Sequence, residues 1–163
     1  MRLPSPVRCL SLLSVTLLAS GCAAFAEYGS ETEFGLGVRG NAGLDRVIPG
    51  EAGDAALSRM EGSASLHQFW MEGADYTEAN LDVLLPLVPL GGGAARTYVG
   101  TGVNLGRVSP DMGSSDTNVG LNLIGGVRFQ RRAFAPFFEL RGSVGGQDQL
   151  SGLVGVQLTG GLF

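Results

Sequence analysis

Ser65 and the single histidine of the chain, His67, are the side chains best placed by type and spacing to do covalent chemistry. Residues two positions apart on a β-strand point to the same side. A histidine beside a serine hydroxyl, itself oriented by an acid, can activate that hydroxyl for acyl transfer. No motif typical of such enzymes surrounds this pair, so we expect no catalytic residue and no enzymatic activity.

Metal and cofactor sites have little support in the sequence. One histidine and the cysteines Cys9 and Cys22 do not supply the ligands of an ordinary zinc site. The acids within residues 111–116 lack the spacing of a calcium loop, and no helix follows Gly100-x-Gly102 to present its N-terminus to a phosphate. We therefore expect neither a metal nor an organic cofactor. The formal net charge of −4 also makes nucleic acid an unsuitable partner.

The N-terminal segment has the organisation of an export signal. Arg2 and Arg8 are followed by an apolar stretch over residues 9–18. A helix needs about 20 apolar residues to span a membrane, so this stretch is too short. Its length is that of a signal-peptide core.

Two alternative processing sites follow this apolar stretch in the sequence. Ala24 and Ala26 form a small-x-small cleavage site, whose use removes residues 1–26 and leaves residues 27–163 as the mature domain. Leu18 to Cys22 resembles a lipobox, although Ala stands in place of the usual Leu three positions before the cysteine. We expect plain cleavage after Ala26, with lipidation of Cys22 as the alternative.

Apolar residues alternate with polar or small ones through most of the remaining chain, which predicts β-strands with one apolar face. The alternating segments are 33–43, 80–87, 97–106, 118–129, 137–144 and 150–162, and a seventh lies within 63–72 with ambiguous phase. An eighth strand is expected within 44–62 or 27–32.

The composition of the second face favours a membrane barrel over a soluble sheet. That face is dominated by glycine with occasional charges, which suits a narrow interior better than a water-exposed surface. A tilted strand crosses the hydrocarbon layer in about 9–11 residues, and a spanning sheet must close because lipid cannot satisfy backbone polar groups. We predict an all-β fold, an antiparallel up-and-down transmembrane β-barrel of about eight strands.

Polar side chains on the inner face predict a hydrogen-bonded and ion-paired network, because unpaired charges in a closed interior are costly. The expected members are Arg39, Asp82, Asn104, Asn122, Arg128, Glu139, Arg141 and Gln157. Phe69, Trp70 and Tyr76 are expected at the membrane interface. Residues 130–133 are expected as a short periplasmic turn and 109–116 as an extracellular loop, with the usual asymmetry of short turns and long loops.

Four segments carry a family resemblance: Thr97–Leu105, Val119–Phe129, Pro136–Arg141 and Leu158–Phe163. They resemble strands of the small bacterial outer-membrane β-barrel family, the OmpA/OmpX-like eight-stranded proteins. In that family the last strand ends in an aromatic assembly signal, here Phe163. Phe163 has the parity of the inner face unless a bulge lies at Gly160-Gly161.

The resemblance implies location in the outer membrane of a Gram-negative bacterium. We expect as partners the outer-membrane lipid with its lipopolysaccharide and the barrel-assembly machinery, with the chain a monomer. The resemblance implies no shared activity, and we expect a structural, interaction or minor porin-like role. One alternative is a soluble periplasmic or lipid-anchored β-barrel that binds a small apolar ligand in an apolar interior. Another is a barrel enzyme that acts on lipid through His67.

Overall fold

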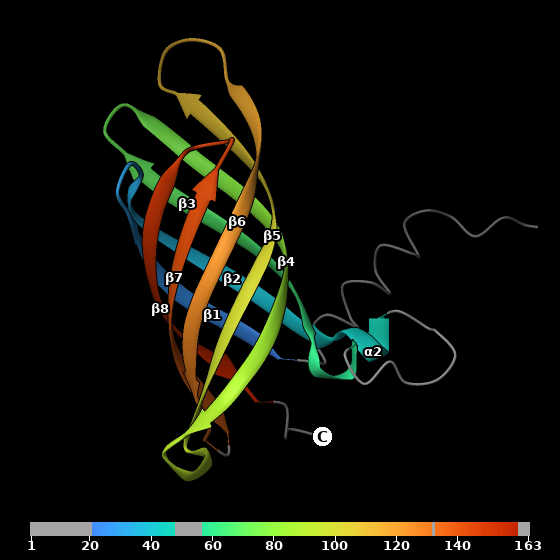
Figure 1. Ribbon diagram of the computed structural model, residues 1–163. Coiled ribbons are helices and arrows are strands. Elements are labelled where there is room, and N and C mark those ends of the chain that lie inside the picture. The colour runs from blue at the N-terminus through green and yellow to red at the C-terminus, as the bar shows by residue number, and fades with distance from the viewer. Residues whose placement is uncertain (1–20, 48–56, 132, 160–163) are drawn as a thin grey trace, which may run out of the picture.

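Eight antiparallel strands form a closed barrel, in which each strand pairs with the next and β1 pairs with β8 (Figure 1). The computed structural model describes residues 21–47, 57–131 and 133–159. The strands are β1 Cys22–Gly29, β2 Glu33–Gly43, β3 Glu61–Met71, β4 Ala74–Leu90, β5 Ala95–Pro110, β6 Asp116–Phe129, β7 Phe134–Val144 and β8 Gln149–Leu158. The predicted all-β, up-and-down barrel of eight strands is confirmed.

The eighth strand is β1, and most of it precedes residue 27. Of the two segments expected to hold it, 27–32 contributes only the last three residues of β1. In the described part of 44–62 the short helices α2 (Leu44–Val47) and η1 (Leu57–Arg59) come before β3 begins at Glu61. Ala24 and Ala26 are compatible with a cleavage site as well as with a β-strand. The sequence analysis assigned them to the cleavage site, and most of β1 was therefore not predicted. The peptide bond after Ala26 lies inside this strand.

Side chains alternate between the outside and the inside of the barrel, with the apolar set outside. On β6, Leu123 is 66% exposed while its neighbour Asn122 is 0% exposed. Large apolar residues are exposed on every strand, and buried positions are mostly polar. This pattern is the reverse of a soluble protein, in which the apolar face of a sheet packs inward.

The three aromatics expected at the membrane interface are divided between the two faces. Trp70 points outward and stacks on Phe34 with ring centroids 6.5 Å apart. Phe69 and Tyr76 are buried inside the barrel, with centroids 5.6 Å apart, so the expectation was wrong for these two. Adjacent residues of a strand point to opposite faces of the sheet. Phe69 and Trp70 therefore could not both face the membrane.

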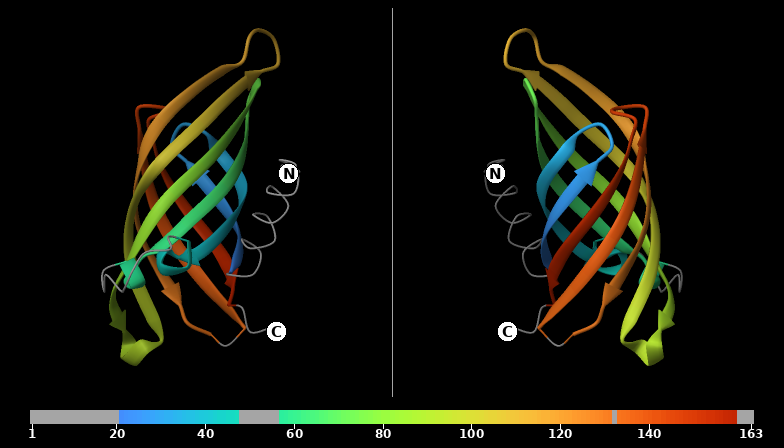
Figure 2. Two further views of the ribbon diagram at one scale, coloured as in Figure 1. Left: turned by 90° about the vertical axis from the view of Figure 1, so that its right-hand side faces the viewer. Right: turned by 90° about the vertical axis from the view of Figure 1, so that its left-hand side faces the viewer.

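Two ends of the barrel are distinguished by their connections (Figure 2). Connections 30–32, 72–73, 111–115 and 145–148 lie at one end, which we call the outer end. Connection 91–94 and the described parts of connections 44–60 and 130–133 lie at the other end, together with the start of β1 and the end of β8. Turn 130–133 and loop 111–115 are thus at opposite ends, as expected.

The expected length asymmetry is wrong, because the longest connection, 44–60, lies at the end where β1 starts. The outer end carries only short turns. The parts of the protein that project from this end are therefore long strands and not long loops. The β5–β6 hairpin projects there, and the β4–β5 hairpin projects at the other end (Figure 1). Phe163 and Gly160-Gly161 lie outside the described residues. No helix in the described ranges has the length and hydropathy to cross a membrane.

Candidate functional site

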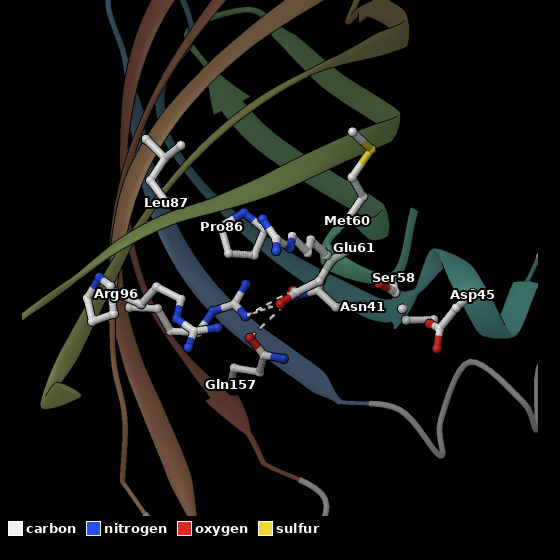
Figure 3. A pocket seen from close by; sticks show the side chains of 14 residues that line it. Asn41, Asp45, Ser58, Met60, Glu61, Pro86, Leu87, Arg96 and Gln157 are labelled. Carbon is white, nitrogen blue, oxygen red and sulfur yellow. Dashed lines mark hydrogen bonds and ion pairs between the residues drawn. The ribbon is translucent and has the colours of Figure 1, made fainter. Parts of the chain in front are cut away.

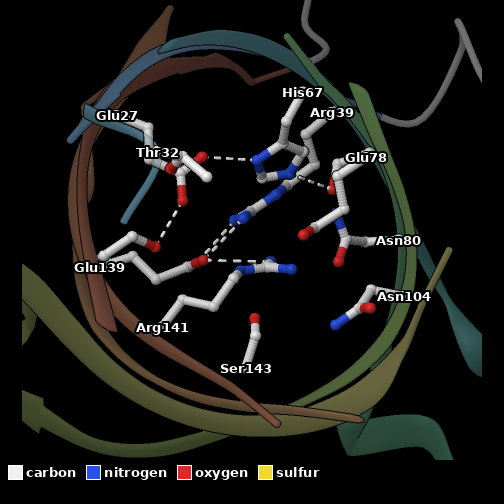
Figure 4. Close-up of polar contacts among 12 residues, drawn as sticks. Glu27, Thr32, Arg39, His67, Glu78, Asn80, Asn104, Glu139, Arg141 and Ser143 are labelled. Atoms are coloured by element: carbon white, nitrogen blue, oxygen red, sulfur yellow. Dashed lines mark hydrogen bonds and ion pairs between the residues drawn. The ribbon is translucent and has the colours of Figure 1, made fainter. Parts of the chain in front are cut away.

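Arg39, Arg141 and Glu139 lie together at the centre of the barrel interior (Figure 4), and Asp82 pairs with Arg141 there. Arg39 from β2 donates two hydrogen bonds of 2.7 Å to the two carboxylate oxygens of Glu139 from β7. Arg141 donates to Asp82 at 2.9 Å and to Glu139 at 3.3 Å, and Tyr98 donates to Glu139 at 2.9 Å. All of these side chains are buried. The cluster joins strands β2, β4, β5 and β7 across the lumen.

An amide cluster extends this ion-pair cluster through Asp82. Asn122 donates to Asp82 at 3.0 Å and to Asn80 at 2.6 Å. Its carbonyl oxygen accepts from Asn104 at 2.6 Å and from Ser143 at 3.1 Å. Asn122 can make these contacts because an amide offers both donors and an acceptor. The amides thus connect the central charges to β5 and β6.

Ser65, His67 and Glu27 form a hydrogen-bonded chain closer to the outer end. The Ser65 hydroxyl lies 2.8 Å from His67 Nε2, and His67 Nδ1 lies 2.5 Å from a Glu27 carboxylate oxygen. Ser151 donates to the other Glu27 oxygen. The His67 ring lies between Phe25 and Phe69, with centroid separations of 4.8 and 6.2 Å.

This chain has the connectivity of a Ser-His-acid triad, in which an acid orients the histidine and the histidine activates the serine. Such a triad also needs a nucleophile that substrate can reach. Ser65 is 7% exposed, and His67 and Glu27 are buried as well. The Ser65 hydroxyl is thus enclosed in this structure, and the hydrogen bonds among Ser65, His67, Glu27 and Ser151 join β1, β3 and β8.

The mouth of the barrel at the end where β1 starts holds a second group of polar residues (Figure 3). Arg128 donates to both oxygens of Glu61, at 2.9 and 3.2 Å, and Asn41 donates to Gln157 at 3.3 Å. A cavity of about 690 Å³ opens here, and Arg96 also lines it. Arg128 lies over the Tyr98 ring, 5.3 Å from its centroid.

The structure brings six of the eight residues expected in the network into one connected cluster. They are Arg39, Asp82, Asn104, Asn122, Glu139 and Arg141. Arg128 and Gln157 also point inward, but their partners are Glu61 and Asn41 at the mouth. Arg128 and Gln157 lie away from the central cluster because the strands are tilted. Inward residues of different strands therefore lie at different levels along the barrel axis.

Several interior residues were missed by the sequence reasoning. Glu27 was assigned to the mature N-terminus, and the phase of the strand that carries Ser65 was ambiguous. The inward parity of β2 and β4 did contain a signal for Asn41 and Asn80, since each shares its face with an expected network residue. In the described ranges, no group of three or more metal-ligating side chains comes together.

Known structures with this fold are small outer-membrane barrels. The N-terminal β-barrel domain of OprF from Pseudomonas aeruginosa superposes with a TM-score of 0.59 at 14% identity, covering 85% of this chain and 96% of that chain. Neisserial surface protein A gives a TM-score of 0.52 at 14% identity, covering 85% and 94%. No family model and no curated protein sequence matches the chain. The resemblance to eight-stranded outer-membrane barrels is thus confirmed for the fold.

Proposed function

We propose that this protein is an outer-membrane β-barrel with a structural or interaction role and no catalysis. The reversed facing of its strands carries the proposal. An outward surface of Leu, Val and Phe on β2 to β8, continued by Tyr28 on β1, would be exposed to water in a soluble protein. Exposed apolar patches of such extent indicate a membrane or partner surface, and a closed barrel satisfies its backbone in lipid.

Aromatic residues on the outside support this orientation in a bilayer. Tyr28, Phe34 and Trp70 are exposed toward the outer end, and Phe129 and Phe134 are exposed toward the other. Aromatic belts at both interfaces are typical of outer-membrane barrels. Outer-membrane lipid would therefore surround the region between these two groups.

The filled lumen favours a structural role over a porin-like one. Arg39, Glu139, Arg141 and Asp82 cross the interior at its centre, and their side chains are at most 2% exposed. Eight-stranded barrels have room for side chains and not for an open channel. Solute passage would require these ion pairs to separate.

The polar interior also argues against the alternative of a barrel that binds a small apolar ligand. Such a site is lined mainly by hydrophobic side chains. Here the buried set includes four acids, two arginines and several amides, and only short apolar clusters such as Leu84, Tyr98 and Ile124 interrupt it.

Charge at the outer end bears on the proposed contact with lipopolysaccharide. Exposed acids there are Glu31, Glu33, Glu72, Asp75, Asp111, Asp116 and Asp148. Lipopolysaccharide phosphates are also anionic, so contact at this rim would need divalent cations between them. The remaining proposed partner is the barrel-assembly machinery, with the folded protein a monomer.

Membrane fractionation with a heat-shift assay tests the proposal. The full chain would be expressed in a Gram-negative host, and the envelope extracted with detergent and run by gel electrophoresis with and without boiling. We expect the protein in the outer-membrane fraction, with a change in apparent size on boiling. A periplasmic protein that needs no detergent and shows no heat shift would contradict the proposal.

A further inference from the structure

We propose that the leader of this protein is removed by hydrolysis of the Gly21–Cys22 bond, so that the mature chain keeps the whole of β1. This inference rests on the proposed export to the outer membrane, and it differs from the expected cleavage after Ala26. Water adds across the bond: the Gly21 carbonyl carbon gains the hydroxyl and the Cys22 nitrogen gains the proton. The mature chain then begins at Cys22.

The pairing of β1 with both of its neighbours carries the inference. Cys22–Ala26 pairs in register with Gly40–Leu36 of β2, and Ala23–Ala26 pairs with Gln157–Val154 of β8. Cleavage after Ala26 would leave only Glu27, Tyr28 and Gly29 between these two strands. The facing edges of β2 and β8 would then expose unpaired backbone groups where Val38 and Val156 face outward. Open sheet edges do not occur in the hydrocarbon of a membrane.

Phe25 gives a second and independent argument. Its side chain is buried and makes edge contacts with His67 and Phe137, at centroid separations of 4.8 and 6.4 Å. The Arg39 guanidinium lies 5.4 Å from the centre of the Phe25 ring. Cleavage after Ala26 would remove the Phe25 ring and leave a cavity beside the central ion pairs.

Of the described residues, cleavage before Cys22 removes only Gly21. Gly21 lies outside β1 and contributes one backbone hydrogen bond, in which its carbonyl oxygen accepts from Asn41 N at 3.1 Å. Its φ of +124° marks the point at which the chain leaves the extended strand. In the sequence, Ala19 and Gly21 are also small residues at the spacing that a signal peptidase recognises.

Two processing routes produce the same new N-terminus. Plain cleavage leaves an unmodified Cys22. In the lipoprotein route the Cys22 thiol takes the diacylglyceryl group of a phospholipid, forming a C–S bond as the phosphate headgroup leaves with the thiol proton. Cys22 lies at the edge of an outer recess of about 850 Å³, lined by small and apolar residues that include Ala24, Ala64 and Leu158. A lipid on Cys22 would therefore lie against the lipid-facing surface. The experiment separates the two routes by mass.

Mass spectrometry of the mature protein tests the inference. The full chain would be expressed in a Gram-negative host with labelled fatty acid, extracted from the envelope, and measured intact and as its N-terminal peptide. We expect a mature chain that begins at Cys22, either at its plain mass or heavier by lipid that carries the label. A chain that begins at Glu27, or at any other residue, overturns the inference.

Two variants make the test independent of that single measurement. Ala26→Leu places a large residue at the rival site while its side chain faces outward, and we expect processing and heat shift to stay unchanged. Cys22→Ser should block processing in the lipoprotein route and leave it intact in the plain route. Accumulation of the Ala26→Leu precursor would overturn the inference. An uncleaved protein in the cytoplasm would overturn both the inference and the proposed function. A mature protein in the envelope that begins at Glu27 would overturn the cleavage site alone.

Discussion

Arg39 and Glu139, on strands that do not pair with each other, form a two-pronged ion pair across the centre of the barrel with both N–O distances at 2.7 Å. Each member is almost fully shielded from solvent. A charge in this position depends on its partner, because removing one member leaves the other buried and uncompensated.

Arg39→Met should therefore destabilise the barrel strongly. We expect a loss of about 3–5 kcal/mol in the free energy of unfolding, since Glu139 keeps a buried charge with fewer donors. Urea unfolding in detergent micelles measures the change. Arg128→Met is the control, because its ion pair with Glu61 is partly exposed and such pairs contribute about 0–1 kcal/mol. Equal losses for the two variants would contradict the central role of Arg39.

Leu123→Arg tests which face of the barrel meets lipid. Leu123 is near the middle of β6 and points outward, and an arginine on the lipid face near the bilayer midplane costs about 2–4 kcal/mol. We expect a loss of that size in lipid vesicles. Met112→Arg in the outer loop 111–115 is the control and should change the free energy of unfolding little. A neutral Leu123→Arg variant would indicate that this face is in water.

Phe25→Ala tests whether the mature barrel contains all of β1. Truncating a buried phenylalanine costs about 3–5 kcal/mol, and this side chain also contacts His67 and Arg39. We expect the heat-shift midpoint to fall accordingly. A mature Phe25→Ala protein with the mass and midpoint of the unchanged protein would mean that Phe25 had been removed with the leader.

The ion-paired lumen should not conduct ions steadily. In planar bilayers we expect the unchanged protein to give no sustained current, because Arg39, Glu139, Arg141 and Asp82 occupy the cross-section. The double variant Arg39→Ala with Glu139→Ala removes the central pair and should produce measurable current if it folds, which its heat shift checks. A steady current through the unchanged protein would support the porin-like role instead.

Ser65 should not react as a catalytic serine. It has a histidine partner, but its hydroxyl is buried beside His67, so a fluorophosphonate probe should label the folded protein no more than it labels Ser65→Ala. Labelling at Ser65 that is lost in His67→Phe would contradict the proposed absence of catalysis and would indicate a lipid-processing enzyme.

The sequence alone was sufficient for the facing of most strands. In β6, for example, the spacing of Val119, Leu121 and Leu123 put them on one face, and the glycine-rich composition of the other face assigned them to the outside, where they are exposed. This could be predicted because the alternation of side chains is a local property of the extended backbone. β1 was not predicted in full, because Ala24 and Ala26 satisfy both a cleavage-site pattern and the pattern of a strand. Only the pairing of β1 with β2 and β8 shows that these residues belong to the barrel.

Which inward residues meet was decided by the tertiary structure. The sequence placed Arg39, Arg128 and Glu139 on the inner face, but their partners depend on the stagger of the strands and on the closure of β1 against β8. That stagger accumulates over all eight registers and brings Arg39 level with Glu139, while Arg128 lies level with Glu61 at the mouth. Local pattern thus determined the face of most strand residues, and closure of the whole sheet determined their partners.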